Sequence, residues 1–157
     1  MKKRRFFWVL SLTLVLLLQA CASQQREPRE IRAQIEKKTA LPSGVWYTSG
    51  RAIWEEEYLP SSLRRLFFGE EEIGELRYAV FLGQSPDAPA EIVLLSCNDA
   101  RTAERISSHL AARLSLLQAE GESVFGASLA DAAVVRRGLC VLYTATPCNK
   151  EILSCFG

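Results

Sequence analysis

The stretch AEIVLLSCNDARTAERISSHLAARLSLLQAEG, residues 90–121, decides the fold. It begins with Ala90–Cys97, an apolar run whose Ile, Val and Leu residues favour a buried strand. Ala100–Ala119 then repeats apolar residues at spacings of three and four, which predicts an amphipathic helix. Asn98 or Asp99 can cap the start of this helix. The apolar stripe consists of Ala103, Ile106, Leu110, Leu114 and Leu117.

Strand-forming segments flank this unit on both sides. Leu76–Gly83 predicts a strand before it, and the connection through Pro86 and Pro89 is short enough to make the two strands antiparallel neighbours. Beyond the helix, Ala132–Arg136 and Leu139–Thr144 predict a hairpin that turns near Gly138.

Two further helices are expected, one over Pro60–Phe68 and a last one from Pro147 to about Phe156. The start of Val45–Tyr58 favours extended structure, broken at Ser49-Gly50. From Leu76 onward the order is therefore β-β-α-β-β-α. This order predicts an α+β domain: a two-layer sandwich of an antiparallel sheet with helices on one face.

The first 20 residues predict an export signal. Met1–Arg5 is basic, and Phe6–Leu18 is a 13-residue apolar run. A helix of that length covers only about 20 Å, less than the ~30 Å hydrocarbon core of a bilayer. The run therefore has the length of a signal-peptide core rather than of a permanent span.

The run ends at Leu18-Gln19-Ala20-Cys21, which resembles the lipobox of bacterial lipoproteins in its Leu, its small Ala and its Cys. The resemblance implies cleavage before Cys21, a lipid on its thiol, and a membrane location on the extracytoplasmic face. Gln19 departs from the small residue usual at its position. The alternative is an uncleaved signal anchor with an incidental cysteine.

The mature chain is then expected to consist of a polar tether over residues 21–44, which can include a short helix over Glu30–Thr39, and one globular domain over residues 45–157. Removing the four basic residues that precede Cys21 leaves 15 Lys and Arg against 18 Asp and Glu, a net charge of −3. This balance argues against nucleic acid as a partner.

The second half also has the pattern EIVLLSCND, then ARTAERISSHLAARLSLL, then AAVVRRGLCVLYTAT and a short last helix. Over Arg77–Phe156 it is similar to an uncharacterised lipoprotein family of Firmicutes with a domain of unknown function. The resemblance implies an envelope lipoprotein with a compact α+β domain. It supplies no functional residues.

Four cysteines follow Cys21, namely Cys97, Cys140, Cys148 and Cys155. The last two are seven residues apart, so on one helix their Cα atoms lie about 10.5 Å apart, too far for a disulfide. Cys97 and Cys140 lie on predicted strands and are the candidate disulfide. The alternative is that all four are buried thiols. No spacing favours a metal site or another cofactor.

The histidine and glutamate residues that a hydrolase could use for catalysis can also be explained as surface or packing residues. His109 is the single histidine and lies beside the apolar stripe of its helix, without a serine elbow in the sequence. Glu55–Glu57 and Glu70–Glu72 are carboxylate clusters that a glycosidase would use as a pair, but adjacent glutamates usually form a solvated surface.

Four aromatic residues near the start of the domain are the candidate partner-binding residues: Trp46, Tyr47, Trp54 and Tyr58. Aromatic side chains anchor protein partners and stack on sugars, or else pack a segment onto its core. The sequence thus predicts a membrane-anchored, non-enzymatic module that binds an envelope protein or a cell-wall component, or merely spaces other proteins. The alternative is a hydrolytic enzyme that acts on cell-wall material.

Overall fold

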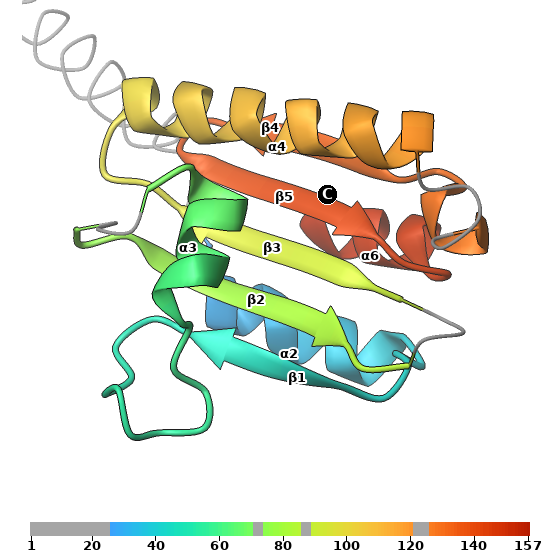
Figure 1. The fold of residues 1–157 in the computed structure, drawn as a ribbon, viewed down its shortest axis with the longest axis horizontal. Coiled ribbons are helices and arrows are strands. Elements are labelled where there is room, and N and C mark those ends of the chain that lie inside the picture. Colours follow the sequence, from blue (N-terminus) through green and yellow to red (C-terminus); the bar gives the residue numbers. More distant parts are fainter. Residues whose placement is uncertain (1–25, 71–73, 86–88, 121–125) are drawn as a thin grey trace, which may run out of the picture.

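The structure is a computed structural model that describes residues 26–70, 74–85, 89–120 and 126–157. It contains a five-stranded antiparallel sheet in the order β1-β2-β3-β5-β4 (Figure 1). The strands are β1 (Gly44–Thr48), β2 (Arg77–Gly83), β3 (Glu91–Ser96), β4 (Ala133–Arg137) and β5 (Cys140–Ala145). The helices are α2 (Pro28–Lys38), α3 (Ser61–Phe68), α4 (Ala100–Glu120), the 3-10 helix η1 (Gly126–Leu129) and α6 (Asn149–Phe156).

Both predicted hairpins are present. β2 pairs antiparallel with β3, and β4 with β5. The turn between β4 and β5 holds Gly138 at a φ of 60°, a conformation that glycine adopts without strain. Pairing of β3 with β5 joins the two hairpins at the centre of the sheet, and β1 adds the outer strand beside β2.

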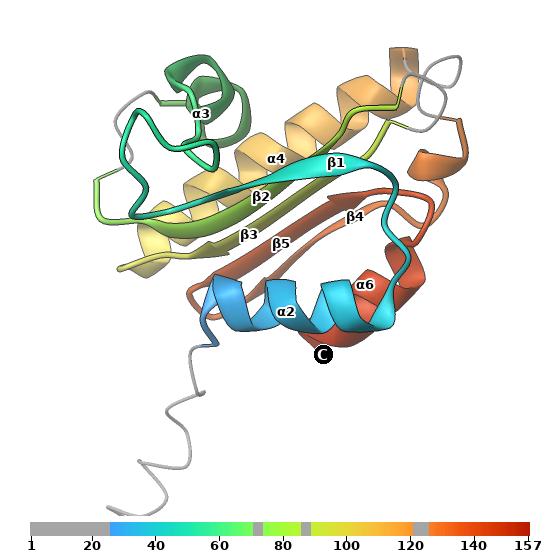
Figure 2. The same cartoon turned by 90° about the horizontal axis from the view of Figure 1, so that it is seen from below.

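Helices cover both faces of the sheet (Figure 2). α3 and α4 pack on one face, over a core that includes Tyr78, Val93 and Tyr143. The α+β class, the antiparallel sheet and this helix–sheet sandwich are confirmed. The prediction placed helices on one face, whereas α2 and α6 cover the opposite face as well. The reason is that every residue of β3 and β5 is buried, so both faces of the central strands need an apolar cover.

α2 lies within the segment expected to be a tether. Its Ile31 and Ile35, one turn apart, are buried against the sheet, and the helix packs beside α6. From Pro28 onward the chain therefore belongs to the domain, in contrast to the expected spacer over residues 21–44. Pro28 is tolerated at the start of the helix because its missing N–H would have no intrahelical partner there.

The start of α2 and the end of β1 lie at the same end of the sheet, on the left in Figures 1 and 2. The last turn of α4 lies at the other end. Residues 1–25, which hold the predicted signal and Cys21, lie outside the described residues. Among the residues described, no helix is both long and apolar enough to cross a membrane.

Candidate functional site

The most exposed apolar side chains lie on the segment Gly50–Tyr58, which joins β1 to α3 and is called the Trp54 loop below. Ile53 is 71% exposed and Trp54 is 84% exposed. Single exposed apolar residues are common on protein surfaces, but two adjacent residues this exposed form an apolar patch that can bind a partner.

Hydrogen bonds within the loop fix the shape of its tip. The Ala52 N–H donates to the Glu55 carboxylate over 2.5 Å, and the Glu55 N–H donates to the Ala52 carbonyl over 2.9 Å. The Arg51 guanidinium lies 3.3 Å from Glu55 and 3.0 Å from Glu57. Ile53 and Trp54 therefore project from a braced turn.

Glu57 ties this turn to the domain. Its carboxylate accepts a hydrogen bond from the Thr48 hydroxyl at 2.9 Å and lies 3.3 Å from Arg32 of α2. Its carbonyl accepts from the Thr48 N–H at 3.0 Å. Partial burial acts to raise the pKa of Glu57, but the hydrogen bond from Thr48 and the charge of Arg32 outweigh it, so the pKa is lowered.

Replacing Glu57 with glutamine is expected to loosen the loop while leaving the domain folded. The loss in unfolding free energy is below about 1 kcal/mol, because the ion pairs are partly exposed. Faster motion of the indole should lower the fluorescence anisotropy of Trp54, measured in the mature chain with Trp46→Phe so that Trp54 is the reporter. In the native protein the same loosening should occur as the pH falls through this lowered pKa, which lies below the ordinary Glu value of 4.5. Protonation there removes the negative charge that Thr48 and Arg32 stabilise.

The matched control is Glu56→Gln, which removes the same charge from an exposed neighbouring residue. It should leave the anisotropy unchanged. Equal effects of the two substitutions would contradict the bracing role of Glu57.

The four aromatic residues predicted to form one binding surface do not lie together. Trp46 is buried against Phe81, with ring centroids 5.2 Å apart, on the α2 face of the sheet. Tyr47, the next residue on the strand, packs towards the α4 face, because successive strand residues alternate between faces. Tyr58 is partly buried beneath the Arg64 guanidinium. Trp54 alone of the four is exposed.

Two shallow hollows lie beside the Trp54 loop. One, of about 320 Å³, is lined mainly by charged residues of α2 and the loop, including Arg32, Arg51 and Glu57. The other, of about 460 Å³, lies between the start of α2, the end of β1 and the start of β2, and includes Pro28, Arg29, Gly50 and Arg77. In the first hollow Arg32 and Arg51 are paired with Glu36 and Glu57, and Arg29 donates to the Ser49 carbonyl. The exposed apolar tip is the feature of this end that has no such partner within the described residues.

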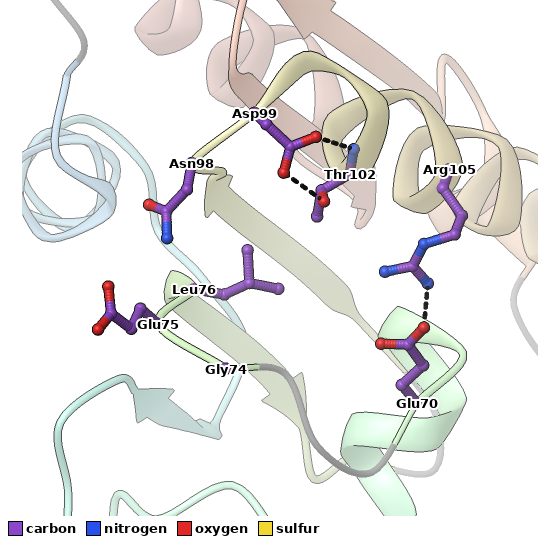
Figure 3. Close-up of a pocket in the computed structure, with 8 residues that line it drawn as sticks. All are labelled: Glu70, Gly74, Glu75, Leu76, Asn98, Asp99, Thr102 and Arg105. Atoms are coloured by element: carbon purple, nitrogen blue, oxygen red, sulfur yellow. Dashed lines mark hydrogen bonds and ion pairs between the residues drawn. The ribbon is translucent and has the colours of Figure 1, made fainter.

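A third hollow, of about 250 Å³, lies between the start of α4 and the segment before β2 (Figure 3). Four of its side chains, those of Asp99, Thr102, Arg105 and Glu70, are engaged locally. Asp99 accepts hydrogen bonds from the N–H and hydroxyl of Thr102 and so caps α4, as one of the two residues predicted to do so. Arg105 pairs with Glu70 at 2.9 Å. Figure 3 shows the Asp99 carboxylate directed to its own helix rather than into the hollow.

The other residue types considered for catalysis also have structural partners. His109 joins two helices, with its Nε2 2.9 Å from the Leu66 carbonyl and its ring beside Gly69. Glu55 and Glu57 bind Arg51, and Glu70 binds Arg105. Glu71 and Glu72 lie outside the described residues.

Cys97 and Cys140 are thiols rather than a disulfide. Cys140 begins β5 and Cys97 directly follows the last residue of the neighbouring strand β3, but Ser96 rather than Cys97 is the register partner of Cys140. This offset of one residue puts the two side chains on opposite faces of the sheet. Burial raises the pKa of Cys97 to about 11, which disfavours the reactive thiolate.

Sequence reasoning overlooked Ile53 and the braces of the Trp54 loop. One signal was present: Arg51 precedes Glu55 by four residues and Glu57 by six, around an apolar pair. Comparison of the chain with models of protein families, with curated proteins and with solved structures gave no match.

Proposed function

We propose that the protein is a lipid-anchored protein of the bacterial envelope, held on the extracytoplasmic face of a membrane through Cys21. Its domain is a non-enzymatic interaction module that uses the Trp54 loop as its contact surface. The observation that carries this proposal is the ordered signal in the sequence: basic residues, an apolar run too short to span, and Leu18-Gln19-Ala20-Cys21.

The fold is consistent with anchoring close to the bilayer. α2 begins at Pro28, seven residues after Cys21. Fully extended, that length of chain reaches about 25 Å. Two or three acyl chains on Cys21 would hold the domain stably, whereas a single chain gives only reversible binding.

Cys21→Ala tests the anchor. The variant is expected to lose labelling by a palmitate analogue, and either to leave the membrane fraction or to remain as the uncleaved precursor. Cys148→Ala, which removes a partly exposed cysteine of the domain, is the control and should be labelled like the native protein. Labelling of the Cys21→Ala variant at the native level would overturn the proposal.

A further inference from the structure

The tip of the Trp54 loop is suited to an apolar partner, because its arginine already has carboxylate partners within the loop. Ile53 and Trp54 project from it, while Arg51, beneath them, is paired with Glu55 and Glu57. A partner that recognises this tip therefore gains by burying the indole and the isoleucine side chain rather than by neutralising charge.

The chain from Cys21 arrives at the same end of the domain. The Arg29 guanidinium, in the first turn of α2, donates to the Ser49 carbonyl at the base of the loop over 2.8 Å. Pro28 and Gly50 line the same hollow. Because Cys21 is at most about 25 Å from Pro28, a lipid on that cysteine keeps this end of the domain next to the bilayer.

We infer that the Trp54 loop contacts the interfacial region of the bilayer that holds the lipid on Cys21. The inference rests on the proposed lipid anchor and names the partner of the same loop. Tryptophan favours the membrane–water interface because its ring is apolar and its N–H can still hydrogen-bond. Ile53 beside it adds a purely apolar side chain that enters the same layer.

This second contact would fix the orientation of the domain on the membrane. The lipid on Cys21 and the Trp54 loop are two points at one end, so the last turns of α4 face away from the bilayer. Since Arg51 of the loop is paired with Glu55 and Glu57, and the exposed Glu56 is negative, the contact should form on neutral phosphatidylcholine and gain nothing when anionic lipid is added.

The test uses the mature, acylated full chain in phosphatidylcholine vesicles whose acyl chains carry bromine close to the headgroup, since bromine quenches indole fluorescence at short range. The mature chain has two tryptophans, because Trp8 precedes Cys21. Trp46→Phe leaves Trp54 as the reporter. We expect its emission to shift to shorter wavelength on vesicles and to lose intensity when the lipid is brominated.

The matched control moves the reporter to the other end of the domain. The triple variant Trp46→Phe, Trp54→Phe, Leu116→Trp places the indole at an α4 position that is 60% exposed in the native protein. It should show neither the shift nor the quenching. If Trp46→Phe prevents folding, the difference between the native protein and Trp54→Phe measures the Trp54 signal.

The possible failures are distinguishable. An acylated, vesicle-bound protein whose Trp54 is quenched no more than the reporter at position 116 would overturn this inference alone, and would leave the loop to a protein partner. A protein with no acyl mass that stays off vesicles would overturn the proposed anchor, and this inference with it.

Discussion

Glu91→Leu is expected to destabilise the domain by about 3 kcal/mol, the lower end for a broken buried ion pair, because it leaves Arg113, whose side chain is only 18% exposed, without its counter-charge. Glu91 on β3 is buried beneath α4. Arg113 of α4 donates two hydrogen bonds to its carboxylate, one of them from Nε at 2.9 Å. The Tyr143 hydroxyl of β5 donates to the same carboxylate at 2.8 Å.

The environment of this cluster is apolar, which is why the loss is large. Arg113 also lies 5.3 Å from the centre of the Phe67 ring, so helix α3 closes the site. Burial acts to lower the pKa of Arg113, but its hydrogen bonds and ion pair with Glu91 raise it. Urea unfolding followed by circular dichroism measures the effect.

A rescue variant separates the lost ion pair from general damage to the core. Glu91→Leu combined with Arg113→Met and Tyr143→Phe removes all three polar partners together. It should regain most of the stability, because apolar replacements of a buried pair are often neutral. Glu104→Leu is the control: it breaks an exposed ion pair between Glu104 of α4 and Arg136 of β4, and should lower the free energy of unfolding by less than about 1 kcal/mol. Equal losses for Glu91→Leu and Glu104→Leu would contradict the account.

Asn149→Asp is expected to lower the free energy of unfolding by about 3–5 kcal/mol at neutral pH. It replaces a buried amide that donates two hydrogen bonds with a carboxylate that is repelled by the same two carbonyl oxygens. The Asn149 amide donates to the carbonyls of Ser128 at 2.9 Å and Ala130 at 2.7 Å. Its oxygen accepts from the Thr144 hydroxyl at 2.7 Å and the Thr146 N–H at 2.9 Å. The side chain thus joins the start of α6 to β5, to η1 and to the residue that follows η1.

The loss should shrink as the pH falls. A buried carboxylate facing two carbonyls has a raised pKa in the folded state, so the folded state binds more protons than the unfolded state and stability rises towards acid pH. Asn98→Asp makes the same chemical change at an exposed residue and should leave the urea midpoint nearly unchanged. Native-like stability of Asn149→Asp at neutral pH would show that Asn149 is not buried in this network.

The elements that sequence could predict are those with strong local signals. α4 combines a long apolar stripe with a capping Asp99, and the β4–β5 turn contains a glycine at positive φ. α2 was missed as part of the domain because just two isoleucines, Ile31 and Ile35, form its apolar face within a polar segment. The second helical layer had a signal, since EIVLLS and CVLYTA are apolar at nearly every position rather than at alternate positions.

The side-chain placements that matter most depend on register and packing, which local pattern does not reveal. Cys140 faces Ser96, so a shift of one residue in strand register separates it from Cys97. Trp46 and Trp54 are eight residues apart in one aromatic-rich segment, yet Trp46 lies on a strand inside the core and Trp54 at the tip of a loop. Glu91 meets Arg113 and Tyr143 through three different elements, so no sequence window contains the cluster.

Intact-mass measurement of the native protein, purified from its own membrane, tests the anchor most directly. The account predicts a chain that begins at Cys21 and carries the added mass of a diacylglyceryl group on that residue. A chain that retains Met1 and carries no acyl mass would contradict it.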